Sequence, residues 1–128
     1  MTYTGIFILI ILIHTLADFS LQTHKQSQKK SESNLALLQH VATYSLVWYI
    51  ALIAISHPTT AGDLVFLLAY TGIFVGLPHF CVDYFSSRLS RVFFEKEEYH
   101  DGFVVIGFDQ MLHLIMLWVA ITQIIIIN

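Results

Sequence analysis

The sequence predicts an all-α integral membrane protein: a four-helix transmembrane bundle with a buried His/Asp cluster near the cytoplasmic side. Three observations carry this prediction. Of the 128 residues, 56% are hydrophobic and only 12% are charged, which is about half the charged fraction of a typical soluble domain. Four apolar segments are each long enough to cross a hydrocarbon core, which needs roughly 20 helical residues. Each of these segments carries two polar residues spaced four positions apart.

Charge and cysteine content exclude several other classes of protein. Nine acidic and six basic residues give a formal net charge of −3, so we expect no nucleic-acid partner. Cys81 is the only cysteine, which excludes an intramolecular disulfide and a four-cysteine zinc module. The length predicts a single domain over residues 1–128.

The predicted spans cover residues 3–22, 35–56, 63–86 and 103–127, and each has the continuous apolar composition of a lipid-exposed helix. The first contains His14 and Asp18 and has no basic residue at its start, which disfavours a cleaved signal peptide. In the third, Pro78 removes a backbone hydrogen bond and predicts a kink. Gly72 and Gly76 have the spacing that lets a neighbouring helix approach closely.

The distribution of basic residues predicts the orientation of the chain in the membrane. All six lie in the two loops that follow the first and third spans, namely Lys25, Lys29, Lys30, Arg88, Arg91 and Lys96. The positive-inside rule places both loops in the cytoplasm. Both termini are therefore expected outside the cytoplasm.

The polar pairs within the spans share a spacing and a depth. They are His14 with Asp18, His40 with Tyr44, His79 with Asp83, and Asp109 with His113. The i to i+4 spacing puts both members of a pair on one helix face. At 1.5 Å per residue, all eight lie roughly 5–15 Å inside the cytoplasmic boundary. A four-helix bundle has one interior to receive them, so we expect one buried site open towards the cytoplasm.

The energetic cost of these residues argues for a function. An aspartate inside a span costs roughly 2.5–3.5 kcal/mol, so three cost on the order of 8–10 kcal/mol. Hydrogen bonds between membrane helices average only about 0.6 kcal/mol each. A purely structural role for the pairs is therefore disfavoured.

Imidazole and carboxylate together are typical ligands of transition metals. We expect one or two divalent ions, with zinc first and manganese or iron as alternatives. The predicted ligands are His14, Asp18, His40, His79, Asp83, Asp109 and His113. The alternative for this cluster is a metal-free relay in which histidine and aspartate pass protons.

Catalytic and substrate-binding roles can be assigned to the same region. An aspartate among Asp18, Asp83 and Asp109 that does not coordinate the ion could activate a metal-bound water. Gln22, Lys25 and Gln110, together with Tyr44, are the predicted substrate-binding residues. Their amide, ammonium and hydroxyl groups could orient an oxyanion.

These motifs resemble one small family. The segments are His14-Thr-Leu-Ala-Asp18-Phe-Ser-Leu-Gln22, His40 with Tyr44, His79-Phe-Cys-Val-Asp83 and Asp109-Gln-Met-Leu-His113. In this order they are similar to the bacterial and phage membrane family catalogued as domain of unknown function 3307. The resemblance spans nearly the whole chain. It implies a multi-pass protein of the bacterial inner membrane and supplies no activity.

Three functions compete for this pattern. The first is a metal-dependent hydrolase acting on a lipid-borne or amphipathic phosphate or ester at the cytoplasmic leaflet. The second is a transporter or channel component for divalent metal or protons, working as a homo-oligomer. Against it, the outer halves of the spans carry little polar lining beyond Thr122 and Gln123, whereas a conduction path is polar on both sides of its site. The third is a non-enzymatic membrane interaction module.

Overall fold

The computed structural model describes residues 2–127 and is helical apart from short connections. Its elements are α1 (Tyr3–Thr15), the π-helical η1 (Leu16–Ser20), α2 (His24–Lys29), α3 (Asn34–Ser56), α4 (Ala61–Thr71), the π-helical η2 (Gly72–Gly76), α5 (Leu77–Glu95) and α6 (Tyr99–Ile127). Four continuous stretches are long and apolar enough to cross a membrane, namely Tyr3–Ser20, Asn34–Ser56, Ala61–Glu95 and Tyr99–Ile126. The predicted all-α fold with four long apolar helices is confirmed.

Two elements differ from the sequence expectation. The third long helix continues to Glu95, whereas the apolar composition that predicts the span ends at residue 86. Residues 87–95 contain no glycine or proline, and α5 packs along α6 as a hairpin, so the helix persists after its composition turns polar. The loop predicted after the first span contains α2, which begins with a capping box between Thr23 and Gln26.

Side-chain caps and one left-handed residue set the ends of the long helices. The side chains of Thr2, Ser33 and Thr60 accept hydrogen bonds from the first turns of α1, α3 and α4. These bonds satisfy amides that have no partner within the helix. At the other end of α3, His57 adopts a φ of 49°, and Pro58, which follows it, cannot continue the helix.

Two π-helical turns interrupt the long helices beside the polar residues. In η1, which carries Asp18, the amide of Leu21 donates to the carbonyl of Leu16 at 3.0 Å. The second turn, η2, ends directly before α5, whose first turn contains Pro78. Because Pro78 has no amide hydrogen, the backbone must rearrange there. A π-helical turn thus directly precedes the helix start that contains Pro78, and the kink expected there stays a prediction.

The predicted close helix approach holds at one of the two glycines. A Cβ built on Gly76 would lie 2.5 Å from Ser45 Oγ, so η2 and α3 are in close contact there. A Cβ on Gly72 would meet nothing within 4 Å. Only Gly76 therefore serves the close approach between these two elements.

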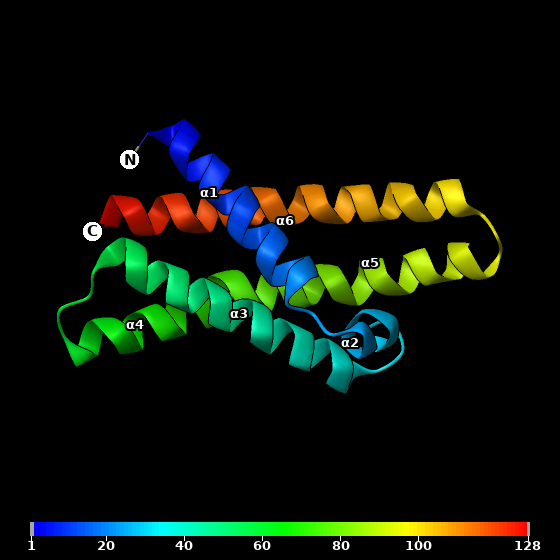
Figure 1. Cartoon of the computed structure of the whole chain (residues 1–128), viewed down its shortest axis with the longest axis horizontal. Coiled ribbons are helices and arrows are strands. Elements are labelled where there is room, and N and C mark those ends of the chain that lie inside the picture. The colour runs from blue at the N-terminus through cyan, green and yellow to red at the C-terminus, as the bar shows by residue number, and fades with distance from the viewer. Residues whose placement is uncertain (1, 128) are drawn as a thin grey trace.

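The helices run antiparallel, with both chain ends near the turn between α3 and α4 and opposite the turn between α5 and α6 (Figure 1). Helix α6 packs against α5 and α1, and α3 packs against α4 and α5. The half of the bundle near the chain ends holds the apolar core, which includes Ile10, Trp48, Leu52, Leu67, Leu117 and Ile121. The polar pairs lie in the other half.

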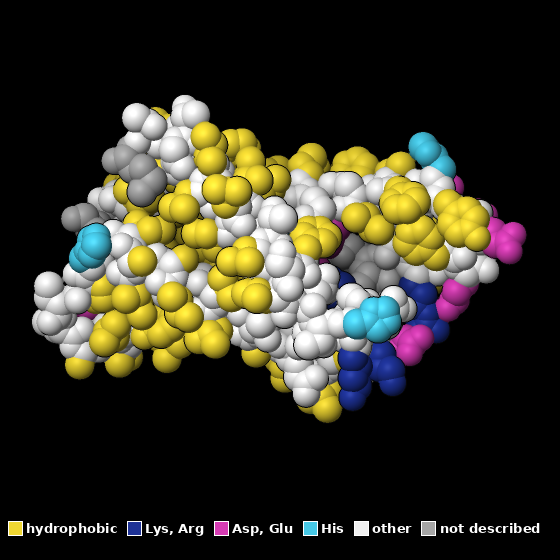
Figure 2. All heavy atoms as spheres, in the orientation of Figure 1, with side chains coloured by type: hydrophobic (Ala, Val, Ile, Leu, Met, Phe, Trp, Pro, Cys, Tyr) yellow, Lys and Arg dark blue, Asp and Glu magenta, His cyan; other side chains and the backbone are white. Residues whose placement is uncertain are grey.

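The surface divides in the same way. Figure 2 shows hydrophobic side chains spread over the long helices, whereas lysine, arginine and acidic side chains gather near α2 and the α5–α6 turn. Many large apolar side chains are exposed, among them Ile50, Val65 and Phe103. A soluble monomer rarely exposes so much contiguous apolar surface. The apolar surface and the four long helices suggest a membrane setting.

Candidate metal centre

The four long helices bring every predicted polar pair into one interior. His14 and Asp18 come from α1 and η1, His40 and Tyr44 from α3, His79 and Asp83 from α5, and Asp109 and His113 from α6. All eight side chains are buried, and the most exposed of them, Asp109, retains 8% of its accessible surface. The buried His/Asp cluster expected from the sequence is confirmed.

Four donor atoms within this cluster converge on one point. His40 Nε2 lies 3.1 Å from Asp18 Oδ1, 3.1 Å from His79 Nε2 and 3.3 Å from Asp83 Oδ2. His79 Nε2 lies 3.7 Å from Asp18 Oδ1 and 3.6 Å from Asp83 Oδ2. We call these four residues the quartet. One hydrogen on His40 Nε2 cannot serve three neighbours fully at once, and these four atoms could together hold a metal ion.

The spacing of the quartet suits a tetrahedral ion. Bonds of 2.0–2.1 Å from a tetrahedral zinc place neighbouring ligand atoms about 3.3–3.4 Å apart. Five of the six distances between quartet atoms run from 3.1 to 3.7 Å, and the sixth, between the two carboxylate oxygens, is within 4.8 Å. The Nδ1 atoms of His40 and His79 are buried without a hydrogen-bond partner. Nε2 of a neutral ring offers a lone pair to an ion only when Nδ1 carries the ring proton, and in both rings that proton would then lie on an atom without a described hydrogen-bond partner.

Two further groups of donor atoms overlap the quartet. They are His14 with Asp18 and His113, and Asp83 with Asp109 and His113. Asp18 Oδ1 faces the quartet, whereas its Oδ2 lies 3.8 Å from His14 Nε2. Asp83 Oδ2 faces the quartet, and its Oδ1 lies 3.8 Å from His113 Nε2. Both carboxylates therefore present one oxygen to each side, as carboxylates that bridge two ions do.

The two remaining histidines differ in how they are held. The amide oxygen of Gln110 can only accept, so His14 Nε2 donates to it at 2.9 Å, and in the neutral ring Nδ1 accepts from the Tyr44 hydroxyl at 3.0 Å. Neither ring nitrogen of His113 makes a hydrogen bond. Its Nδ1 lies 3.4 Å from Asp109 Oδ2. Of the two, His113 is therefore the histidine without a hydrogen bond to its ring nitrogens, and it belongs to both further groups that could hold a metal ion.

Tyr44 positions two of the cluster histidines. Its ring stacks on His79 with 3.7 Å between centroids and 10° between planes, and its hydroxyl contacts His14. The Tyr44 side chain is buried, with 1% of its accessible surface exposed. The role of Tyr44 in binding substrate stays a prediction, whereas its stacking and its hydrogen bond orient two imidazoles.

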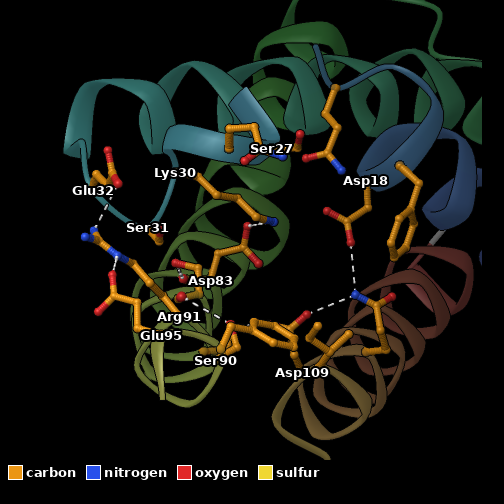
Figure 3. A pocket seen from close by; sticks show the side chains of 18 residues that line it. Asp18, Ser27, Lys30, Ser31, Glu32, Asp83, Ser90, Arg91, Glu95 and Asp109 are labelled. Carbon is orange, nitrogen blue, oxygen red and sulfur yellow. Dashed lines mark hydrogen bonds and ion pairs between the residues drawn. The ribbon is translucent and has the colours of Figure 1, made fainter. Parts of the chain in front are cut away.

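A cavity of about 610 Å³ opens beside the cluster (Figure 3). It is lined by Asp18, Gln22, Lys30, Asp83, Asp109 and Gln110, and by a row of α5 side chains that includes Ser86, Ser87, Ser90 and Arg91. Gln110 Nε2 donates to Asp18 Oδ2 at 3.1 Å and to Asp109 Oδ2 at 2.9 Å. Gln22 Oε1 is buried without a hydrogen-bond partner. Both glutamines thus line the cavity, and their role in binding substrate stays a prediction.

Lys30 is a cavity residue that sequence reasoning missed. Its Nζ donates to Asp83 Oδ2 at 2.9 Å. Although burial by itself would lower the pKa of Lys30, the Asp83 carboxylate outweighs it and raises that pKa above its ordinary value, so Lys30 is charged at neutral pH. Lys25, the lysine predicted to bind substrate, is exposed on α2. The aspartates within the spans could have indicated that a lysine lies nearby. They could not have shown whether it is Lys25, Lys29 or Lys30.

The formal charges of the cluster sum to −2, which is the charge that one divalent cation would balance. Asp18, Asp83 and Asp109 contribute −3 and Lys30 contributes +1, which leaves −2 with the histidines neutral. Uncompensated charge in a membrane interior costs several kcal/mol. A single divalent ion in the quartet would cancel this charge.

Fold and site together define a class: a small four-helix protein of membrane-spanning composition, with a buried His/Asp cluster that could bind a metal ion. The chain belongs to the family described as "Protein of unknown function (DUF3307)", whose model matches residues 6–128. The resemblance inferred from the four motifs is confirmed. No curated protein and no solved structure matches the chain. Function therefore has to be argued from the site itself.

Proposed function

We propose that this protein is an integral membrane metalloenzyme, a hydrolase that cleaves a lipid-borne or amphipathic phosphate or ester at the cytoplasmic leaflet. The observation that carries the proposal is the quartet of donor atoms, two of whose residues, Asp18 and Asp83, line an open cavity. A metal site buried on all sides would serve structure alone, whereas one beside a cavity has room for water and substrate.

Zinc is the ion that the quartet suits best. Two imidazole nitrogens and two carboxylate oxygens form a donor set that zinc accepts in tetrahedral geometry, and the donor spacing supports that geometry. Manganese and iron take the same donors with more ligands, which the second oxygens of Asp18 and Asp83 and the free His113 could supply. If a second ion binds, these second oxygens and His113 would be its ligands.

The groups around the cavity suggest how hydrolysis would proceed. Asp18, His40, His79 and Asp83 would hold the ion, which would supply Lewis-acid chemistry and activate water in the cavity. Asp109 lies outside the quartet and lines the cavity, so it is the proposed base that accepts the water proton and later returns it to the leaving oxygen. The amides of Gln22 and Gln110 would orient the substrate, since both line the same cavity.

Transport of metal or protons finds less support. On the side of the cluster away from the cavity, the bundle interior is filled by Ile10, Trp48, Leu52, Leu117 and Ile121, all at most 3% exposed. A conduction path would need polar groups or water there. Among the described residues, the cavity therefore opens on one side of the cluster, and the apolar core closes the other side.

We also propose that the cavity faces the cytoplasm. The support is that both basic loops lie at the end of the bundle where the cavity opens, opposite the chain ends. A C-terminal alkaline phosphatase fusion should be active in whole bacterial cells, and a C-terminal fluorescent protein that folds only in the cytoplasm should be dark. The opposite pair of signals would reverse the orientation.

The proposed activity can be tested on purified protein in lipid nanodiscs. We expect metal-dependent hydrolysis of nitrophenyl acetate, nitrophenyl phosphate or bis(nitrophenyl) phosphate, with one to two zinc ions per chain by elemental analysis. Asp109→Asn should lower kcat by about 10²–10⁴-fold, because it removes the proposed base, and should retain the ion in the quartet. A metal-free wild type would exclude this mechanism. Zinc uptake by proteoliposomes without hydrolysis would favour transport.

A further inference from the structure

A second depression lies between α5 and α6 on the apolar surface of the bundle. We call it the α5–α6 groove; it has a volume of about 460 Å³, and Phe85, Leu89, Val105, Phe108 and Leu112 form its apolar walls. Phe85 and Phe108 retain 72% and 60% of their accessible surface. In a membrane this surface contacts the hydrocarbon core, so the groove is accessible to lipid chains and not to water.

The groove ends at residues of the polar cavity. Ser86 and Asp109 line both spaces. Ser86 Oγ donates a hydrogen bond to Asp109 Oδ1, and this pair forms part of the wall between the apolar groove and the cavity. An aspartate beside lipid-exposed apolar surface is costly, and the pair is the place where a molecule with a hydrocarbon part and a polar part would match both surroundings.

We propose that the α5–α6 groove binds the hydrocarbon chain of a membrane lipid substrate, whose ester or phosphate group reaches the cavity past Ser86 and Asp109. This inference rests on the proposed function and assigns its substrate class. The chain lies against Phe85, Leu89 and Leu112, and the group to be cleaved lies beside Asp109, the proposed base. The substrate therefore moves in from the side, between two helices, without leaving the bilayer.

The polar half of such a substrate finds complementary groups in the cavity. Lys30 Nζ lies beside Asp83 Oδ2, which is also a donor atom of the quartet. An ion in the quartet would compete for that oxygen, and the Lys30 ammonium would then be free for a phosphate or carboxylate oxygen. With a divalent ion bound, the cluster is neutral, so an anionic group is not repelled from it.

Binding of the chain can be tested by photo-crosslinking in nanodiscs that contain phosphatidylglycerol with a diazirine in one acyl chain. We expect crosslinks, mapped by mass spectrometry, to be concentrated on α5 and α6 around Phe85 and Leu112. Leu112→Trp places a larger side chain in the groove and should reduce crosslinking there by about tenfold, the affinity carried by roughly two buried methylene groups. Leu46→Trp is the matched control, because Leu46 is an exposed leucine on α3.

The same variants separate the groove from the reaction. Leu112→Trp should raise KM for nitrophenyl palmitate about tenfold and should raise KM for nitrophenyl acetate by a clearly smaller factor, with metal content equal to wild type. Concentrated crosslinks without hydrolysis of any ester would uphold the groove and reject the proposed activity. Crosslinks spread evenly over all exposed helices, or insensitive to Leu112→Trp, would overturn the inference. Disulfide-linked dimers through Cys81, which lies in the groove, would overturn it too, because a second copy would then fill the space.

Discussion

His79→Ala should remove the bound ion from the purified protein, so that elemental analysis finds less than about one tenth of the wild-type metal. The variant leaves three ligands of the quartet and a gap on the side where the His79 ring stacks on Tyr44. Loss of a group that merely supports a ligand costs 10–100-fold in metal affinity, so loss of a ligand itself should cost at least about 100-fold. Metal titration of the demetallated protein, followed by competition with a chromophoric chelator, measures this difference.

Two other variants make this result specific. His100→Ala removes an exposed histidine at the start of α6 and should bind metal as wild type does, which controls for nonspecific loss. Lys30→Met removes the cation that competes for Asp83 Oδ2 and should tighten metal binding by about tenfold or more, since charge repulsion at such distances is worth several kcal/mol. Wild-type affinity in His79→Ala would show that the quartet is not the metal site.

The four long helices were predictable because lipid imposes a simple rule. A hydrocarbon core demands about 20 apolar residues in a row, and that length and composition can be counted in a sequence. The rule says nothing about helix beyond the apolar stretch, so the extension of α5 to Glu95 escaped prediction. The π-helical turns also escaped prediction, because η1 depends on a shift of the hydrogen bond at Leu21 by one residue, which composition and spacing do not show.

The cluster was predictable as a set of residues but not as a geometry. Spacing by four residues shows that His79 and Asp83 share a helix face. It cannot show that His40, from another helix, places Nε2 within 3.3 Å of both Asp18 and Asp83. Distances between helices follow from packing, as at Gly76 against Ser45. The separation of the quartet from His113 and Asp109 therefore needed the structure.

The sequence did not show which lysine of the loop after the first span lies in the cavity. Lys25 is nearest in sequence to Gln22, which made it the natural candidate for substrate binding. The capping box of Thr23 with Gln26 starts α2 at once, and Lys25 in its first turn is exposed. Lys30, one position past the end of α2, points back into the cavity. Because α2 forms in this loop, Lys30 lines the cavity and Lys25 does not.

Chelation should destabilise the wild-type protein strongly, and the reason is electrostatic. Asp18, Asp83, Asp109 and Lys30 leave a net charge of −2 in a buried site when no divalent ion is present. Charges buried in a medium of low dielectric constant repel each other and lose hydration, at an effective cost of several kcal/mol per ion. Part of this cost would be avoided if the site took up protons instead. The ion is therefore expected to act as a structural element as well as a chemical one.

The measurement is thermal unfolding in detergent micelles with and without EDTA. An ion present at about 1,000 times its Kd contributes about 4 kcal/mol, which for a chain of this length corresponds to a fall in apparent Tm of roughly 10–15 °C on its removal. His79→Ala should start near the lower Tm and should not respond to EDTA, because it no longer holds the ion; His100→Ala should respond as wild type does. An equal Tm with and without EDTA, in a protein shown to have lost its metal, would mean that protons or Lys30 alone satisfy the cluster. The ion would then not be needed for stability, and the prediction that it acts as a structural element would be wrong.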